Sequence, residues 1–443
     1  MRESPSRFFY VCHFNVGRTL AGHASPEEAR KTPEADSFGG KHISGYVRPG
    51  FEAVREAFEE NFEHRNELGA ACCVYHHGEK VVDLWGGIRD KATGEPWEED
   101  TMVIVASATK GLAGLGMALA QSRGFFDYDD CVSRYWPEFA QQGKEKITIR
   151  QLMAHQAGLY ALDEHVDLKT EADLDKMAVI LARQKPEWEP GTRQAYHAIT
   201  LGFYESELLR RTDPKHRSLG RFFHEEIAIP LGLDFYIGLP DEIPNSRIAR
   251  VHTAIPTPGA AFKAPRRLIL DIANPRSRIN RALWGDLPED KEHVYPRNVE
   301  VPSGGGIGTA RAIAKAYGVF ANGGRELGLH EETLKQLMGP GIPPTRGLYD
   351  EVMRLEGMQM SLGFMKPSPR NPFAHPSSFG MLGFGGNFGF ADPDAQVGFA
   401  YVANLNDLYL MDPRQNGLRF AMYKSLGEKD PALLGKEGEA RPD

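Results

Sequence analysis

Cysteine and long apolar runs are scarce in this sequence. Its 443 residues include four cysteines (Cys12, Cys72, Cys73 and Cys131), and none of them has C-x-x-C spacing. Buried free thiols in a reducing compartment are therefore expected, rather than a disulfide framework or a zinc site. No stretch approaches the roughly 18 to 20 apolar residues of a membrane-spanning helix, and residues 1–20 make a poor signal peptide because their apolar run is short and broken. We expect a cytoplasmic protein with no membrane partner.

A basic surface and the common cofactor and metal motifs are also absent. The 52 Lys and Arg residues are outnumbered by 60 Asp and Glu residues, which gives a net charge of −8, and an acidic surface repels the phosphates of nucleic acid. The glycine run at 303–308 lacks G-x-G-x-x-G, and no H-E-x-x-H spacing occurs. No complete G-x-S-x-G is present, which argues against a nucleophile elbow. We therefore expect no nucleic-acid partner, no metal and no cofactor.

What the sequence does contain is the composition of a soluble globular protein, with 41% hydrophobic and 25% charged residues. Strand-like runs occur towards both ends of the chain, whereas helical patterns with little strand signal fill the middle. This order predicts one α/β (α+β) body built from both chain ends, with a helical insertion between them. The expected parts are an irregular N-terminal arm at 1–40, an α/β domain at 41–126 and 301–427, a helical domain at 127–300 and a disordered tail at 428–443. The clearest expected helices are 51–65, 110–123, 149–154, 171–183, 310–321 and 418–426, and the clearest strands are 69–76, 80–85, 388–391 and 397–404.

The one S-x-x-K of the chain lies where an apolar run, 101–105, passes into a helix. Ser107 would sit at the helix start, where free backbone N–H groups and the positive end of the helix dipole suit an oxyanion. Lys110 is three residues on, so it shares a helix face with Ser107. An exposed lysine is protonated, with a pKa of about 10.4. Lys110 would therefore accept the proton of the serine only if it is buried.

A plainer interpretation of Ser107 is the N-cap of a helix, because serine is a favoured residue in that position. A short motif such as S-x-x-K also occurs by chance. The spacing alone leaves both interpretations open.

Further segments resemble the serine β-lactamase-like family, which includes penicillin-binding proteins and DD-peptidases, class C β-lactamases and family VIII carboxylesterases. The likeness spans residues 45–425 in the right order. It implies a β-lactamase/transpeptidase-like fold, in which an antiparallel sheet flanked by helices is joined to an all-helical insertion domain. The segments are Ser107–Lys110 for S-x-x-K, Leu152–Leu159 for LL-x-H-T-S-G-L, Pro190–Thr192 with Tyr196 for P-G-T and Y-x-N, Ser303–Ala310 for S-G-G-G-x-x-S/T-A, and Phe379–Gly386 for F-G-H-x-G-x-G-G.

The resemblance also implies roles for individual residues. Ser107 would form an acyl-enzyme, and Lys110 and Tyr196 would move protons. The backbone N–H groups of Ser107 and Phe384 would form the oxyanion hole, because Phe384 follows Gly383, the glycine of the third motif.

Two departures from the family pattern bear on the substrate. The second motif ends in Ala198, where β-lactamases carry an asparagine. The third motif begins with Met381 and Leu382, where a lysine or histidine and then a threonine or serine are usual. The cation and hydroxyl that hold a β-lactam carboxylate are thus missing. A bound carboxylate would therefore lack a charge-assisted hydrogen bond worth about 1.5 to 3 kcal/mol. A pocket lined by Met381, Leu382 and Phe384 would be apolar and would suit a neutral ester.

The remaining candidates are histidines and basic residues near these motifs. We interpret His155 as a structural residue that bonds a loop, and His197 as a residue that supports the substrate-binding groups from behind. Lys366, Arg370 or His375 could restore a cation from the loop before the third motif.

The sequence therefore predicts a serine hydrolase that cleaves carboxylic esters, with a small-molecule ester as its substrate. The alternatives are a β-lactamase or DD-peptidase-like amide hydrolase or transacylase, and a non-catalytic binding protein on the same fold. The sequence gives no indication of the oligomeric state.

Overall fold

The computed structural model describes residues 42–253, 270–271, 274–283, 297–406 and 412–434. The arm that we expect at 1–40 lies outside these residues. In the described part of the chain, no helix is both long enough and apolar enough to cross a membrane.

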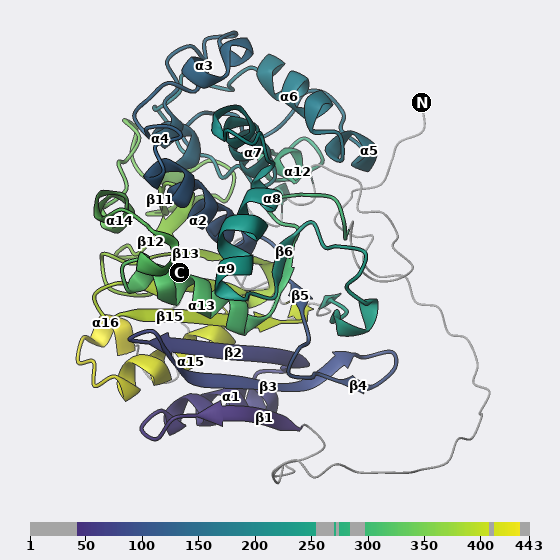
Figure 1. Ribbon diagram of the computed structural model, residues 1–443, viewed down its shortest axis with the longest axis vertical. Coiled ribbons are helices and arrows are strands. Elements are labelled where there is room, and N and C mark those ends of the chain that lie inside the picture. The colour runs from purple at the N-terminus through teal and green to yellow at the C-terminus, as the bar shows by residue number, and fades with distance from the viewer. Residues whose placement is uncertain (1–41, 254–269, 272–273, 284–296, 407–411, 435–443) are drawn as a thin grey trace, which may run out of the picture.

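Antiparallel strands from both ends of the chain form the main sheet (Figure 1), which confirms the expected fold class. Among the described residues the sheet has nine strands, in the order β1-β3-β2-β15-β14-β13-β12-β11, with β4 paired to β3. The strand β2 pairs with β15, so the two chain ends meet in the middle of the sheet. In that spatial order the strands are β1 (Ile43–Val47), β3 (Glu79–Asp90), β2 (Gly69–His76), β15 (Val397–Ala403), β14 (Phe388–Asp392), β13 (Phe379–Leu382), β12 (Phe364–Lys366) and β11 (Gln359–Ser361). The short strand β4 (Glu95–Pro96) pairs with the end of β3.

Helices cover both faces of the sheet and gather above one end of it (Figure 1). The pair α1 and α15 packs on one face, α13 and α2 pack on the other, and helices α3 to α8 lie beyond α2. The helices are α1 (Glu52–His64), α2 (Ala108–Ser122), α3 (Val132–Tyr135), α4 (Ile149–Met153), α5 (Leu168–Glu171), α6 (Leu174–Arg183), α7 (Thr200–Thr212), α8 (Leu219–Phe223), α9 (Ile229–Leu231), α12 (Arg278–Ala282), α13 (Ala310–Ala321), α14 (Glu331–Met338), α15 (Pro413–Ser425) and α16 (Pro431–Leu434).

The strand β2 shows why the sheet carries a core on each side. Cys72 and Val74 belong to the apolar cluster under α1 and α15, whereas Cys73 belongs to the cluster under α2 and α13. This alternation follows from the period of two residues in a strand. The adjacent Cys72 and Cys73 thus point to opposite faces, and both are free thiols.

The described residues in the middle of the chain form only two short strands, which agrees with the little strand expected there. They are β6 (Phe235–Ile237) and β7 (His252–Thr253). Both are too short to produce a visible alternation of apolar and polar residues. β7 pairs in parallel with β16 (Leu405–Asn406), and a separate antiparallel pair joins β9 (Tyr349–Asp350) to β10 (Leu355–Glu356).

A small three-stranded sheet positions the segment before Ser107. β5 (Val103–Ile104) and β6 both pair antiparallel with β8 (Gly306–Gly308). The hydroxyl of Thr109 donates to the oxygen of Ala106 at 2.6 Å and accepts from the N–H of Gly306 at 2.9 Å. The start of α2 and the glycine run at 303–308 are therefore held side by side.

The helix α2 carries Ser107 at its start and is buried around most of its circumference, as its apolar sequence from Ala108 to Ser122 requires. Close neighbours explain its small residues. A Cβ added at Gly114 would lie 2.9 Å from the ring of Phe364. The helix ends at Ser122, and Gly124, two residues later, turns the chain away with a φ of +75° that is favourable only for glycine.

The C-terminal elements differ from the expectation. α15 begins at Pro413 and not at 418, because Asp412 caps it and proline suits a first helical position. The expected disordered tail is wrong for Pro431–Leu434, which form α16, whereas 435–443 lie outside the described residues.

Candidate active site

Ser107 lies in a tight turn at the start of α2 and is partly exposed. The residue before it, Ala106, has a φ of +47°, a left-handed conformation that is costly for any residue with a Cβ. The hydroxyl of Ser107 makes no capping hydrogen bond to the helix. Ser107 thus occupies the N-cap position of α2, but its hydroxyl does not cap the helix and is available for other contacts.

Lys110 is fully buried beneath Ser107. Its Nζ lies 3.3 Å from the Oγ of Ser107 and donates to the backbone oxygens of Ala198 and Ser303, at 2.6 Å and 2.7 Å. Burial lowers the pKa of Lys110 from 10.5 to about 7, and the carboxyl of Glu205 acts in the opposite direction. A substantial fraction of Lys110 is thus a neutral amine at neutral pH.

Tyr196 is the second titratable group against Ser107, to which its side chain is hydrogen-bonded. The Nζ of Lys110 lies 4.8 Å from the centre of its ring. Burial raises the pKa of Tyr196, so the phenol stays protonated and serves as a hydrogen-bond donor. The buried carboxyl of Asp350 accepts from the backbone N–H of Tyr196 and fixes the position of this segment.

Two buried histidines stand behind Tyr196. His197 donates from Nδ1 to the oxygen of Ala195 at 2.6 Å and accepts at Nε2 from the N–H of Leu159 at 3.2 Å. Burial lowers its pKa to about 4. His155 accepts at Nδ1 from the N–H of His197 at 2.9 Å, and its ring lies 5.0 Å from that of Tyr196. Both rings therefore brace the loop, and His197 has no free nitrogen for a substrate.

The loop of the third motif comes directly against the start of α2. A Cβ added at Gly383 would overlap the oxygen of Val105 and lie 3.0 Å from the N–H nitrogen of Ala108. The backbone N–H groups of Ser107 and Phe384 make no hydrogen bond within the described part of the chain. Both donors are therefore available to an oxyanion, and only a glycine fits at position 383.

The three apolar side chains of this loop are placed differently from one another. Phe384 is 45% exposed and Leu382 is partly exposed, so both offer surface to a ligand. Met381 is only 2% exposed and lies in the core beside Gly111 of α2. The prediction that Met381 lines the pocket is wrong, because alternation along β13 turns it inward.

None of the three basic residues considered near the third motif presents a free buried cation. Lys366 is buried and donates to the oxygens of Leu337 and Ser377. Burial lowers its pKa to about 7. His375 lies between the carboxylates of Asp392 and Glu428, and Arg370 is exposed.

Comparison with known proteins identifies the fold and the family. The family model described as Beta-lactamase matches residues 54–421, which is most of the chain. The chain belongs to the β-lactamase family. The resemblance inferred from the motifs is thereby confirmed.

Several members of this family are similar over nearly their full length. The chain is 32% identical over 404 residues to "Esterase/beta-lactamase LipL" of Mycobacterium tuberculosis, covering 89% of this chain and 88% of that protein. A solved family VIII carboxylesterase is 34% identical with a TM-score of 0.74, and a penicillin-binding protein homologue from Caulobacter crescentus is 35% identical with a TM-score of 0.73. Each of these two matches covers 86% of this chain and 99% of the other. The chain is a serine hydrolase of the esterase/β-lactamase type.

Some groups around Ser107 could not be identified as site residues from the sequence alone. The oxygens of Ala198 and Ser303 bind Lys110 through the backbone, which any residue type provides. Glu205 lies in a helix and Asp350 in the short strand β9, among ordinary residues, and only the fold shows that they are buried near the site. No group of residues that could hold a metal ion occurs in the described ranges.

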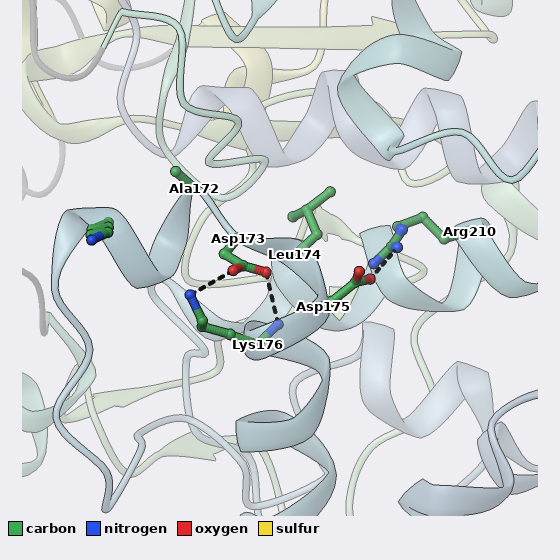
Figure 2. A pocket seen from close by; sticks show the side chains of 7 residues that line it. Ala172, Asp173, Leu174, Asp175, Lys176 and Arg210 are labelled. Carbon is green, nitrogen blue, oxygen red and sulfur yellow. Dashed lines mark hydrogen bonds and ion pairs between the residues drawn. The ribbon is translucent and has the colours of Figure 1, made fainter.

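A separate hollow opens at the start of α6, and none of the predicted site residues lines it. Four of the charges that line it form two ion pairs: Asp173 binds Lys176, and Asp175 binds Arg210 (Figure 2). Because these ions neutralise each other at the surface, we assign no chemistry to this hollow.

Proposed function

We propose that this protein is a carboxylesterase that hydrolyses a neutral ester through an acyl-enzyme on Ser107. The Oγ of Ser107 attacks the ester carbonyl while Lys110 accepts its proton. The alcohol leaves with a proton supplied through Tyr196 and Lys110, and a water molecule then releases the acid by the reverse sequence. The N–H groups of Ser107 and Phe384 stabilise the oxyanion in both steps.

The environment of Lys110 is the observation that carries this proposal. A neutral amine has two N–H groups and one lone pair, and two backbone oxygens accept from the Nζ of Lys110. Its lone pair is then left for the hydroxyl of Ser107, 3.3 Å away. A pKa of about 7 gives the amine the proton affinity of a general base at neutral pH.

The choice of ester over β-lactam rests on the side chains that face the site. Ala198 offers no amide to an acylamino group, and the exposed part of the third motif is the apolar pair Leu382 and Phe384. The similarity to a family VIII carboxylesterase supports the same choice. β-Lactam hydrolysis is the second candidate, because the relative from Mycobacterium tuberculosis is named an esterase/β-lactamase.

Hydrolysis assays of the wild type and Ser107→Ala test the proposal. We expect the wild type to cleave short p-nitrophenyl esters faster than nitrocefin, and Ser107→Ala to lose nearly all ester turnover. Ser133→Ala, in α3, is the matched control and keeps full activity. Full ester turnover by Ser107→Ala would refute the proposal, and faster cleavage of nitrocefin would favour the second candidate.

We also propose a cytoplasmic location. Cys72, Cys73 and Cys131 are free thiols, as is usual in a reducing compartment. Fractionation of the source cells, followed by detection of the protein in the cytosolic or the exported fraction, tests this location.

A further inference from the structure

The loop that carries the N–H group of Phe384 has little rigidity of its own. Glycines flank Phe384 at positions 383, 385 and 386, and Gly385 and Gly386 have φ values of +83° and +88°. Glycine changes its backbone conformation at little steric cost, so this sequence allows the peptide groups of the loop several orientations. An oxyanion donor has to keep one orientation before the reaction begins. Another group in the molecule must therefore hold Phe384 in place.

Asn387, directly after the glycines, bonds to this loop through both its side chain and its backbone. It is only 1% exposed, and its Nδ2 donates to the backbone oxygen of Phe384 at 2.9 Å. Its own backbone oxygen accepts from the N–H of Gly383 at 2.6 Å. The peptide group between Gly383 and Phe384, which carries the N–H of Phe384, is thus held from both sides by one residue.

Asn387 is in turn bonded to the main sheet. Its Oδ1 accepts from the backbone N–H of Ala403, the last residue of β15, at 3.0 Å. The side chain therefore has to donate on one side and accept on the other. An amide does both, whereas an ionised aspartate only accepts and a leucine does neither. The bond to β15 transmits the position of the sheet to the loop.

Arg414 also binds the loop, but its effect is not confined to it. Arg414 donates to the oxygen of Gly385 at 3.1 Å and pairs with the buried carboxylates of Glu67 and Asp412. Its removal therefore disturbs a whole buried network. The bond from Asn387 to Phe384 joins two neutral groups, so its loss changes the loop without leaving a buried charge unpaired.

We propose that Asn387 is a positioning residue that keeps the N–H of Phe384 directed at the oxyanion. This inference rests on the proposed function, in which Ser107 and Phe384 supply the two oxyanion donors. Without the amide, the oxygen of Phe384 loses its donor, and the flanking glycines let the peptide group turn away from Ser107. The effect falls on the transition state, where the negative charge develops, and not on the binding of the ester.

Steady-state ester hydrolysis by Asn387→Leu tests this role, with kcat expressed per site that a fluorophosphonate labels. Leucine is similar in size to asparagine and has neither donor nor acceptor. We expect kcat to fall by about tenfold to a hundredfold with KM nearly unchanged, which is less than the usual cost of a deleted donor because the donor is displaced and not removed. Asn387→Asp keeps the shape of asparagine, replaces Nδ2 by an oxygen and gives the same direction of change if the leucine variant does not fold.

An alkylboronic acid supplies a second readout, which a loss of stability alone does not change. Its boron adds reversibly to the Oγ of Ser107, and a boron-bound oxygen then lies in the oxyanion hole. We expect its inhibition constant to rise in Asn387→Leu by the same factor by which kcat/KM falls, as for a transition-state analogue.

Asn404→Leu is the matched control. Asn404 is also buried and follows the end of β15, but its Nδ2 donates to the oxygens of Ile88 and Arg89 at the end of β3. This variant loses a buried amide of the same kind without changing the contacts of Phe384. It is expected to keep the wild-type kcat per labelled site and the wild-type inhibition constant.

The inference is overturned if the Asn387 variants keep the wild-type kcat and inhibition constant, or if their change is confined to KM. Equal losses of kcat in Asn387→Leu and Asn404→Leu also overturn it, because they indicate general damage. These outcomes leave the proposed function intact. If the wild type neither hydrolyses esters nor is labelled at Ser107, the proposed function itself fails, and this inference fails with it.

Discussion

At the scale of single residues, the proposed chemistry depends on the burial of Lys110. A lysine with a pKa of about 10.4 is a poor base at neutral pH, and only the loss of hydration makes it a neutral amine. The spacing of Ser107 and Lys110 predicted that the two groups meet, and the distance of 3.3 Å agrees with that expectation. Their catalytic roles stay a proposal. The hydrogen-bond acceptors of Lys110 on Ala198 and Ser303 could not be predicted, because they are backbone oxygens, which every residue type has.

The pH dependence of the proposed esterase activity follows from the proposed role of Lys110. Its pKa is lowered to about 7, so the amine is protonated and inactive below that pH and neutral above it. We predict that kcat/KM falls below about pH 7, approaching tenfold for each further unit. A rate that stays constant from pH 8 to pH 5 would contradict a lysine base.

If Lys110 is the base, Lys110→Arg loses activity. A guanidinium stays protonated at every accessible pH and cannot act as a base. We expect kcat/KM to fall by about 10² to 10⁴. Lys144→Arg is the matched control, because Lys144 is also buried with its Nζ on two backbone oxygens, and it should keep most of the activity. Equal losses in both variants would point to general damage.

At the scale of elements, the prediction succeeded where periodic patterns are long and failed where they are short. α13 (Ala310–Ala321) has the bounds expected from sequence, and β2 (Gly69–His76) does as well. The expected helix at 171–183 is split, because the side chain of Asp173 caps a new helix, α6. β6 was missed because three residues carry no visible period.

The loop that holds Phe384 beside Ser107 depends on Gly383. A Cβ at this position would overlap the oxygen of Val105, so Gly383→Ala forces the loop away from α2. We predict that kcat falls by about 10² to 10³, the usual cost of one oxyanion donor, with a smaller change in KM. Gly339→Ala, after α14, is the control, because Gly339 has an ordinary φ of −61° and an added Cβ would come no closer than 3.3 Å to its nearest neighbour. A kcat unchanged in Gly383→Ala would remove this loop from the oxyanion hole.

At the scale of the whole molecule, a buried ion network joins both chain ends to the site. Arg414 of α15 binds Glu67 at 3.0 Å and Asp412 at 2.6 Å, and it donates to the oxygen of Gly385 at 3.1 Å. Tyr401 also binds Glu67. The side chains come from distant parts of the sequence, so no local pattern predicted them. The division into a helical and an α/β domain stays a prediction.

Removing Arg414 is expected to destabilise the fold. Arg414→Met leaves the buried carboxylates of Glu67 and Asp412 without their cation, which typically costs about 3 to 5 kcal/mol. We predict a markedly lower Tm by calorimetry and reduced activity, since the oxygen of Gly385 loses its donor. Arg48→Met removes an exposed ion pair with Glu79 and is expected to leave Tm nearly unchanged. Equal Tm values for both variants would contradict a structural role for the network.

The most direct test of the central claim is to trap the acyl-enzyme. Wild-type protein would be mixed with excess of a slowly hydrolysed p-nitrophenyl ester and quenched with acid, and the acylated peptide would then be located by mass spectrometry. We predict a burst of p-nitrophenol and an acyl group on Ser107, with both absent in Ser107→Ala. An acyl group on another residue, or full turnover with no acyl group on Ser107, would contradict it.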